Sequence, residues 1–278
     1  MPTLTTRLSI RAAACAIGLA LAPTLAAAAD CGNDAGGFPA WLGQLKAKAT
    51  AQGISAATAN AALAGLSYDA NTIRLDRSQR SFKLSFEQFY ARRVSGSLIS
   101  RGQRILQERA ALFDRIEKRF GVPGAVLVSI WGLETNYGGE GNGGKSILRS
   151  LATLAYDCRR SPFFTNELIN ALRIIDKRDM TIGQLNGGWA GEIGPMQFLP
   201  SSYVKFAVDF DGDGRRDLIH SVPDMLASTA NFLKSYGWQA GQPWQPGSAN
   251  FNALKEWNKA DVYSRTIAVM AGKMAGKS

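Results

Sequence analysis

A segment that is apolar at nearly every position, AVLVSIWGLETNYGG, runs from Ala125 to Gly139 and holds one charged residue, Glu134. The triplet GVP at 121–123 precedes it, and proline is well accommodated in the first turn of a helix. The segment is therefore predicted to be a helix that starts at this proline and ends at the glycines. The Val/Ile/Thr alternation of strands is nearly absent from the chain, so the fold is predicted to be mostly α with long loops.

The spacing of apolar residues places further helices along the chain. An Ala-rich stretch predicts two short helices between Phe38 and Leu66, and a mostly polar stretch from Asp69 to Ser81 predicts an irregular crossing on the surface. An amphipathic stretch predicts one long helix from about Ser97 to Phe120. The remaining predicted helices lie at about 147–156, 162–177, 200–207, 224–236 and 259–274.

Glu134 is the carboxylate that this pattern singles out. Its helical neighbours are Ile130, Trp131 and Leu133, and burying an ionised carboxylate among them would be costly. The group should therefore find a partner or hold its proton to an unusually high pH. A raised pKa suits a general acid that protonates the leaving oxygen of a glycosidic bond near neutral pH. The alternative, an exposed glutamate in the last turn before a glycine cap, stays open at this point.

Residues 1–29 have the composition of a secretory signal peptide. Two arginines precede an apolar run from about Ala12 to Leu25, and small residues suited to cleavage follow. This run is too short and too Ala-rich for a stable membrane span, and no later stretch approaches the roughly 20 apolar residues that a membrane-spanning helix needs. Asp30 before Cys31 does not suit a lipoprotein signal, so no membrane anchor is expected. Cleavage after Ala29 would leave a soluble periplasmic domain, 30–278, with a helical N-terminal part to about 120 and a core over 121–278.

The exported chain would be basic and would keep two of its cysteines. Without residues 1–29 it has 30 Lys or Arg and 22 Asp or Glu, a balance of +8. Nucleic acid, anionic lipid and peptidoglycan all fit that charge, and solubility alone would also explain it. Export favours peptidoglycan and argues against nucleic acid. In an oxidising compartment Cys31 and Cys158 are expected to pair, with two free thiols as the alternative.

Two glycine-rich segments follow the apolar helix. GEGNGGKS, from Gly139 to Ser146, has the letters of a phosphate-binding P-loop, but it follows a helix rather than a strand, so a rim of a cleft is predicted instead. GGWAGEIGPMQFLPSSY, from Gly187 to Tyr203, can bring backbone N–H groups and one amide close to a flat ligand such as a sugar. Several aromatic residues could cover sugar faces, although core packing is the alternative for most: Trp131, Tyr137, Trp189 and Tyr203.

GLETNYG at 132–138 and the segment at 187–203 together resemble the lytic murein transglycosylase B family. The family patterns are G-x-E-[ST]-x-[YWF]-G and S-[WF]-A-G-A-M-G-x-x-Q-F-[ML]-P-S-S-Y, and the resemblance extends from about Phe38 to the C-terminus. It implies a lysozyme-like, largely α catalytic domain with Glu134 as the catalytic residue. It also implies that Gln197 contacts the sugar, and that Arg159, Arg160, Asn258 and Tyr263 line the cleft.

The chain departs from the family patterns at several positions. Gly188 stands where serine is usual, and Glu192 stands where alanine is usual. If Glu192 faces Glu134, it could raise the pKa of that group or position a water molecule. Near the C-terminus, Trp257 replaces a tyrosine and Ala260 replaces a serine.

The resemblance implies a reaction that needs no catalytic cofactor. Glu134 would protonate the oxygen that links N-acetylmuramic acid to N-acetylglucosamine, and its carboxylate would then take the proton of the muramoyl C6 hydroxyl, closing a 1,6-anhydro ring. The expected partners are peptidoglycan glycan strands, with cell-wall synthesis or remodelling complexes as candidates. Three alternatives stay open: a hydrolytic lysozyme on the same fold, a non-catalytic murein-binding protein and an exported calcium-dependent adhesin.

An EF-hand-like loop is predicted to bind a structural Ca²⁺. Its first, third and fifth places are aspartates: Asp209, Asp211 and Asp213. Gly214 occupies the sixth place, and His220 at the twelfth cannot supply the usual bidentate carboxylate. The lengthened loop of the family suggests that Asp224 closes the site, with Arg215 giving its backbone carbonyl. A metal-free turn is the alternative, and a single histidine in the chain argues against zinc.

Overall fold

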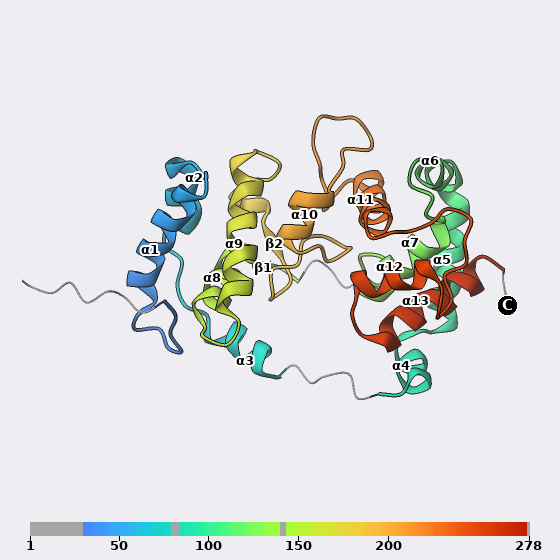
Figure 1. The fold of residues 1–278 in the computed structure, drawn as a ribbon, viewed down its shortest axis with the longest axis horizontal. Coiled ribbons are helices and arrows are strands. Elements are labelled where there is room, and N and C mark those ends of the chain that lie inside the picture. The colour runs from blue at the N-terminus through green and yellow to red at the C-terminus, as the bar shows by residue number, and fades with distance from the viewer. Residues whose placement is uncertain (1–29, 79–83, 140–142, 277–278) are drawn as a thin grey trace, which may run out of the picture.

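The structure is a computed structural model of the chain, and it describes residues 30–78, 84–139 and 143–276. Helices joined by loops make up most of it, which confirms the mostly α prediction (Figure 1). The predicted signal peptide, 1–29, lies outside the described residues. Within the described ranges, no helix is long and apolar enough to cross a membrane.

The helices of the described residues are α1 (Phe38–Ala51), α2 (Ala56–Leu63), α3 (Ala70–Ser78), α4 (Phe86–Arg93), α5 (Gly96–Glu108), α6 (Ala110–Phe120), α7 (Gly124–Thr135), α8 (Ile147–Tyr156), α9 (Ser161–Asp176), α10 (Pro200–Phe206), α11 (Val222–Ser235), α12 (Ala249–Trp257) and α13 (Asp261–Met274). A 3₁₀ turn, η1 (Ile182–Gln184), precedes a short antiparallel ribbon of β1 (Lys145–Ser146) and β2 (Asn186–Gly187), in which Lys145 pairs with Gly187.

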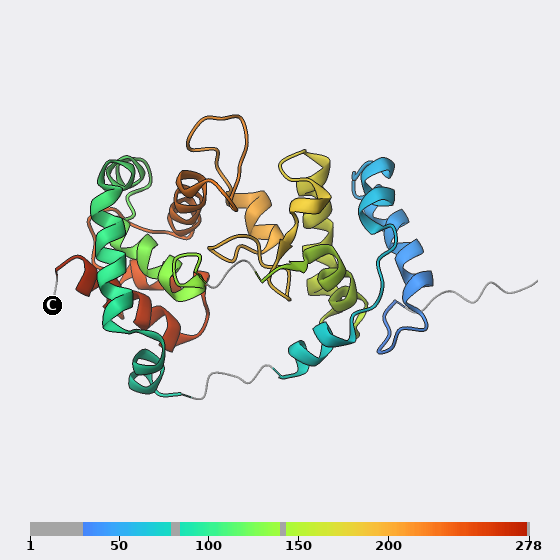
Figure 2. The same cartoon turned by 180° about the vertical axis from the view of Figure 1, so that it is seen from behind.

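Helix α7 is the centre of one half of the molecule. Every residue from Gly124 to Leu133 is buried, and the helix contacts α5, α6, α11 and α13. A helix that is apolar all round must be enclosed by other elements, which explains this position. Figures 1 and 2 show α4–α7 and α11–α13 on one side of the molecule, with α1–α3, α8 and α9 on the other. Helix α10 and the β-ribbon lie between the two sides.

The end of α7 is fixed by its backbone. Asn136 caps the helix in the left-handed conformation, with φ 50° and ψ 50°, which asparagine tolerates better than most residues. The Thr135 hydroxyl donates a hydrogen bond to the Pro195 carbonyl at 2.8 Å and accepts one from the Gly138 N–H at 3.1 Å. The first of these bonds ties α7 to the glycine-rich segment that follows β2, so Glu134 is held in the last turn of the helix opposite that segment.

The other half is tied to the N-terminus. Cys31 and Cys158 form a disulfide, as expected. Beside it, the Tyr156 ring packs against the rings of Phe38 and Trp41, which joins α1 to α8. A disulfide typically stabilises a fold by about 2–4 kcal/mol. This one joins residues that lie 127 positions apart in the sequence.

The irregular crossing predicted from Asp69 to Ser81 is wrong for residues 70–78, which form α3. This helix buries polar groups, Thr72 and Asp76, instead of an apolar stripe. The Asp76 carboxylate accepts hydrogen bonds from the guanidinium groups of Arg159 and Arg160. Ion pairs, rather than an apolar stripe, hold α3 in place. The spacing of apolar residues therefore did not predict this helix.

The single long helix predicted from about Ser97 to Phe120 is also wrong, since the chain breaks at Arg109 into α5 and α6. The break lets α5 pack against α7 while α6 packs against α11. Two further helices, α4 and α12, were not predicted. Each begins at a serine whose hydroxyl caps the first turn, Ser85 and Ser248, so the capping residues were the signal that the sequence offered.

Candidate active site

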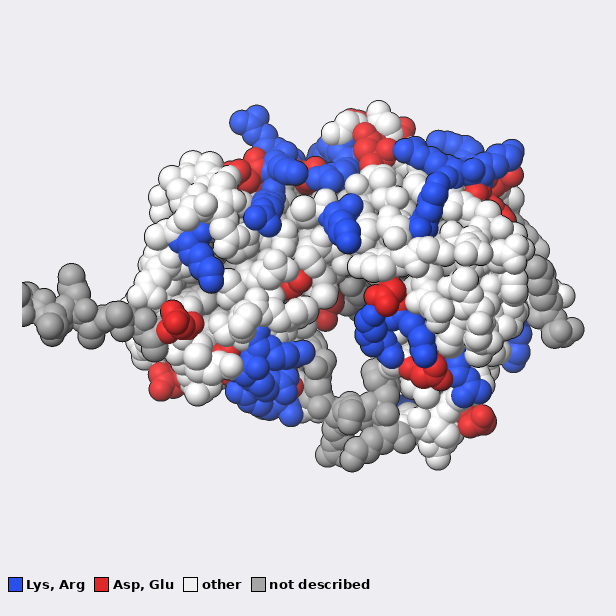
Figure 3. Space-filling model, viewed as in Figure 1, with Lys and Arg blue, Asp and Glu red and all other residues white. Residues whose placement is uncertain are grey.

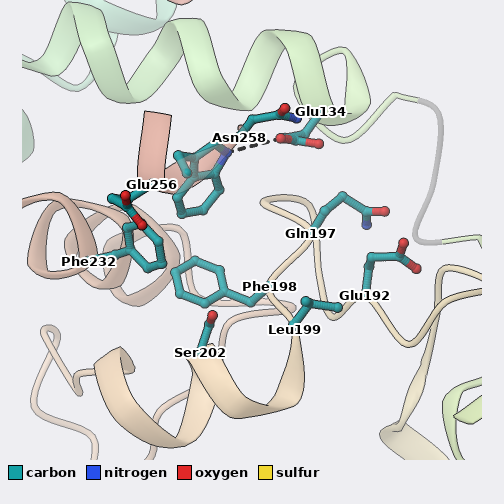
Figure 4. A pocket seen from close by; sticks show the side chains of 10 residues that line it. Glu134, Glu192, Gln197, Phe198, Leu199, Ser202, Phe232, Glu256 and Asn258 are labelled. Atoms are coloured by element: carbon teal, nitrogen blue, oxygen red, sulfur yellow. Dashed lines mark hydrogen bonds between the residues drawn. The ribbon is translucent and has the colours of Figure 1, made fainter. Parts of the chain in front are cut away.

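A cleft of about 330 Å³ opens between the end of α7 and the glycine-rich segment after β2. Figure 3 shows the corresponding face hollowed between the two halves, with acidic side chains in the hollow. Side chains from α7, α10, α11 and α12 and from two loops line the cleft (Figure 4). The lining residues are Glu134, Glu192, Gln197, Phe198, Leu199, Ser202, Phe232, Glu256, Trp257 and Asn258. The structure therefore brings Glu134, Gln197 and Asn258 together at one cleft.

Glu134 receives two hydrogen bonds on the same oxygen. The Tyr263 hydroxyl donates to Oε1 at 2.7 Å, and the Trp257 indole N–H donates to Oε1 at 3.1 Å. Tyr263 is buried, whereas Glu134 keeps part of its surface open to the cleft. With Oε1 engaged by the protein, Oε2 is the oxygen left to exchange a proton with a ligand.

The pKa of Glu134 is raised above the usual glutamate range. Burial among apolar side chains is the largest cause, because the ionised form loses its hydration. The hydrogen bonds from Tyr263 and Trp257 and the charge of Arg93 oppose it, while the negative charge of Glu192 adds to it. Burial and the neighbouring Glu134 in turn raise the pKa of Tyr263 well above its ordinary value, so this phenol stays a donor. Glu134 thus has the environment of a general acid.

The opposite wall is the loop from Gly188 to Phe198. Ile193 and Phe198 exchange backbone hydrogen bonds of 2.7 and 3.0 Å, which closes the loop into a tight turn. Gln197 sits in this turn with a left-handed backbone, φ 55°, and its side-chain amide donates to the Gly194 carbonyl at 2.8 Å. The turn therefore fixes both the position and the orientation of the Gln197 amide at the cleft.

The third wall comes from the junction of α12 and α13. Asn258 lines the cleft, and its side-chain oxygen accepts a hydrogen bond from the Ala260 N–H at 3.0 Å. Its carbonyl accepts from the Ser264 hydroxyl at 3.0 Å. These bonds hold the junction so that Trp257 and Tyr263, on either side of it, both reach Glu134.

Arg159 and Arg160 do not line this cleft. They lie before α9 and bind the buried carboxylate of Asp76, each with roughly 40% of its side chain exposed. Next to them, Arg77 binds Asp157 at 2.8 Å. In this structure the two arginines anchor α3 against the start of α9.

The sequence prediction missed several lining residues, namely Phe198, Leu199, Ser202, Phe232 and Glu256. Trp257 was noted only as a replacement, yet it is a direct hydrogen-bond donor to Glu134. The ring of Trp257 packs edge-on against both Phe198 and Phe232. The proximity of Phe198 and Ser202 to Gln197 in the sequence was a signal for these two. Phe232 and Glu256 carry no motif that could have indicated them.

The predicted calcium loop has the acidic group that the spacing suggested. Carboxylate oxygens of Asp209, Asp211 and Asp213 lie within 4.8 Å of one another. Such a cluster of oxygen donors fits a hard cation such as Ca²⁺. Backbone N–H groups of the loop also bind these carboxylates, for example Gly212 N–H to Asp209 at 2.7 Å and Arg215 N–H to Asp213 at 2.8 Å.

Asp224, the predicted closing ligand, lies outside that group in this structure. It is fully buried under the loop. One of its oxygens accepts from the Phe210 N–H at 2.7 Å, and the other accepts from the Asp217 N–H at 2.9 Å. The observed role of Asp224 is therefore to hold the two ends of the aspartate loop together.

Comparison with known proteins assigns this architecture to a family. Residues 37–248 match the family described as the transglycosylase SLT domain, and the chain belongs to that family. The chain is 42% identical over 124 residues to the membrane-bound lytic murein transglycosylase B of Escherichia coli (strain K12), a match that covers 44% of this chain and 34% of that protein. It thus spans about a third of the length of this relative.

Solved structures agree with the assignment. SltB3 from Pseudomonas aeruginosa, in complex with NAG-anhNAM-pentapeptide, is similar with a TM-score of 0.80 and 31% identity, over 86% of this chain and 80% of that chain. The Escherichia coli lytic transglycosylase Slt35, in complex with calcium, is similar with a TM-score of 0.74 and 22% identity, over 85% of this chain and 93% of that chain. The predicted family and the lysozyme-like, largely α fold are confirmed.

Proposed function

We propose that the protein is a lytic transglycosylase of peptidoglycan. The observation that carries this proposal is the environment of Glu134: a carboxyl group with a raised pKa, at the mouth of a cleft, with one oxygen held by Tyr263 and Trp257. A single carboxyl group with this environment can serve first as an acid and then as a base. The substrate would be the bond between N-acetylmuramic acid and N-acetylglucosamine.

The reaction would proceed in two proton transfers through the same residue. Glu134 first gives its proton to the glycosidic oxygen, and the substrate's own acetamido carbonyl stabilises the cationic centre that forms at the muramoyl C1. The Glu134 carboxylate, stabilised by the Tyr263 hydroxyl, then takes the proton of the C6 hydroxyl as that oxygen bonds to C1. Atoms balance without water, and the products are a 1,6-anhydromuramoyl end and a free N-acetylglucosamine end.

The other walls would bind the glycan. We assign Gln197 and Asn258 to sugar recognition, since both line the cleft and both are held in place by their own backbone hydrogen bonds. Tyr263 acts through Glu134. Arg159 and Arg160, half-exposed beside α9, would contact the strand or its peptide away from the bond that breaks. The bound fragment NAG-anhNAM-pentapeptide in SltB3 supports this class of ligand for the present chain.

We further propose a periplasmic location and a structural Ca²⁺. The composition of residues 1–29 supports export, and the disulfide supports an oxidising compartment. Ca²⁺ would be held by Asp209, Asp211 and Asp213, with the backbone carbonyl of Arg215, and it would stiffen the loop between α10 and α11. Complexes of cell-wall synthesis or remodelling would be the protein partners.

The deciding experiment is mass spectrometry of the soluble products released from purified murein sacculi by the mature protein. Anhydromuramoyl products that disappear with Glu134→Gln are the expected result. Reducing-end products would instead identify a hydrolytic lysozyme. Release of no soluble product by either protein, with binding to sacculi retained, would replace the proposal with a murein-binding role.

A further inference from the structure

The cleft contains a second carboxylate that the reaction above does not use. Glu192 lies on the loop wall, and in Figure 4 its side chain reaches into the cleft on the side opposite Glu134, next to Gln197. Oε2 of Glu192 accepts a hydrogen bond from the Ala190 N–H at 2.9 Å. The N–H of Glu192 itself is a second backbone donor to this carboxylate. Within the described ranges no side chain donates to it, so the backbone alone fixes the carboxylate and its remaining acceptor sites can face a ligand.

A glycine makes room for this carboxylate. A Cβ atom placed on Gly188 would lie 2.1 Å from Oε2 of Glu192 and 2.9 Å from its Cδ, so no other residue fits there without moving Glu192. The Gly188 N–H also donates to the Glu192 carbonyl at 2.9 Å. The backbone of Gly188 is not in the left-handed region. Glycine is thus needed at position 188 because the Glu192 carboxylate fills the space of a side chain, and not because the backbone there requires glycine.

The two residues depart together from the family pattern, which has serine and alanine at these positions. A serine at position 188 would occupy the space that the Glu192 carboxylate takes here. An alanine at position 192 would leave that space vacant for the serine. Gly188 and Glu192 are therefore sterically coupled, because the Glu192 carboxylate occupies the space that a side chain at position 188 would need.

The charges around the cleft leave Glu192 without a cation. Among the described residues, no Lys or Arg lines the cleft or forms an ion pair with Glu192. The third lining carboxylate, Glu256, is exposed and is neutralised by Lys259 at 2.5 Å. Glu192 has no such cation. Burial raises the pKa of Glu192, and the hydrogen bonds from its own N–H and from the Ala190 N–H oppose that rise, so its charge is present once the pH exceeds this raised pKa.

We propose that Glu192, seated on Gly188, is an electrostatic residue of the reaction: its negative charge stabilises the cationic centre at the muramoyl C1 and keeps the proton on Glu134 until substrate binds. This inference rests on the proposed function. Fixed charges aimed at a developing charge are among the largest contributions to catalysis, and a low-dielectric cleft strengthens them. Glu192 would thus add a counter-charge from the protein to the stabilisation that the substrate's acetamido group gives.

The charged and titratable groups that face Glu134 determine the direction in which its pKa moves when Glu192 is changed. Arg93 on α4 and the donors Tyr263 and Trp257 lower the pKa of Glu134, and Glu192 raises it. Removing the charge of Glu192 should therefore lower the pKa of Glu134 and move the alkaline limb of the pH profile of kcat/KM to lower pH. Loss of packing that admits water would move the limb in the same direction, because burial is the largest cause of the raised pKa. The test therefore needs a variant that removes the charge and keeps the volume of the side chain.

The first test is Glu192→Gln, which removes the charge and keeps the acceptor for the Ala190 N–H. Glu117→Gln on the exposed surface of α6 makes the same chemical change away from the cleft and is the matched control. Initial rates on a soluble murein fragment, measured across pH, should show kcat reduced about 10–100-fold with KM changed far less, and the alkaline limb at lower pH. An unchanged kcat and an unchanged limb in a folded Glu192→Gln protein would overturn the proposal.

Gly188→Ala provides the second test, because the three atoms nearest to the added methyl group all belong to Glu192. It should reduce kcat as much as Glu192→Ala does, and it should cause no further loss when it is introduced into Glu192→Ala. Additive losses in the double variant would overturn the assigned role of Gly188 as the seat of the carboxylate. Wild-type protein that forms no anhydromuramoyl product would instead refute the proposed function itself, so the two failures are distinguishable.

Discussion

Two acidic regions of this protein use the same chemical group in opposite surroundings. Glu134 ends an enclosed apolar helix, and burial raises its pKa. Asp209, Asp211 and Asp213 lie on a loop outside the core, where each carboxylate accepts hydrogen bonds from nearby groups, mostly backbone N–H groups. The first environment favours a carboxyl group that gives and takes a proton. The second favours ionised carboxylates that converge on a cation.

Position in the fold, and not residue type, thus distinguishes the carboxyl group suited to proton transfer from the carboxylates suited to binding a cation. α7 holds its carboxylate rigidly because α5, α6, α11 and α13 pack around the helix. The aspartate loop is held by a few polar contacts, from Asp224 beneath it and from Asp179 and Tyr203 to Arg216. Removing Glu134 should therefore affect the reaction and spare the fold, whereas changing the loop should affect stability and spare the reaction.

The largest expected effect is that of Glu134→Gln on activity. Without the acid, kcat should fall by about 10²–10⁴-fold, the range that general acid–base catalysis contributes. The substitution should also stabilise the folded protein at neutral pH. The folded pKa of Glu134 lies above its unfolded value, so wild-type stability is complete at low pH and decreases as pH rises through the glutamate range.

Thermal unfolding measured across pH checks that second expectation. The advantage of Glu134→Gln over wild type should be present at pH 7 and should disappear below about pH 4, where the wild-type carboxyl group is protonated as well. A variant that is less stable than wild type at pH 7 would mean that the hydrogen bonds from Tyr263 and Trp257 outweigh the cost of burying the charge.

Calcium should have the next largest effect, and the effect should be on stability. At a Ca²⁺ concentration of about 100 times Kd, binding stabilises the folded state by about 2.7 kcal/mol, which raises Tm by about 5–10 °C in a protein of this size. Asp211→Asn should abolish this increase, and initial rates at 25 °C should stay close to those of wild type. Equal Tm values with Ca²⁺ and with EDTA would favour the metal-free turn.

The sequence predicted the parts of this molecule that depend on local pattern. The apolar run that ends at Glu134 predicted α7 and a carboxyl group at its end, and the motif around Gln197 predicted one wall of the cleft. Arg159 and Arg160 were assigned to the cleft from the resemblance alone. The structure instead places both on Asp76, a residue of a helix whose polar sequence gave no hydrophobic period.

Long-range geometry accounts for the rest. That Trp257 and Tyr263 meet on one oxygen of Glu134 depends on the packing of α13 against α7, which no single segment specifies. The coupling of Gly188 to Glu192 likewise required coordinates. The sequence shows two separate departures from the family pattern, and only the structure shows that a Cβ atom on Gly188 would lie 2.1 Å from Oε2 of Glu192. Candidate site residues could therefore be predicted where they belong to a motif, but the positions of these residues relative to one another could not.

Tyr263→Phe should have a smaller effect than the loss of the acid. It removes the 2.7 Å hydrogen bond to Oε1, and a hydrogen bond to a charged group is worth enough to reduce kcat by about tenfold. Because this bond lowers the pKa of Glu134, its loss should move the alkaline limb of kcat/KM to higher pH, opposite to the shift expected for Glu192→Gln. A shift to lower pH in Tyr263→Phe would contradict the assigned role of Tyr263, which is to stabilise the Glu134 carboxylate.

Trp257→Phe should have the smallest effect of the series. The indole N–H lies 3.1 Å from Oε1 and is a weaker donor than the phenol, so its loss should reduce kcat by about threefold. Phenylalanine keeps an aromatic ring against Phe198 and Phe232, which limits the loss of packing. Both donors serve one oxygen, so in Tyr263→Phe the remaining indole bond should strengthen. The double variant should then lose more than the product of the two single losses, whereas independent losses in a kinetic double-mutant cycle would mean that the two donors do not act on Glu134 as a unit.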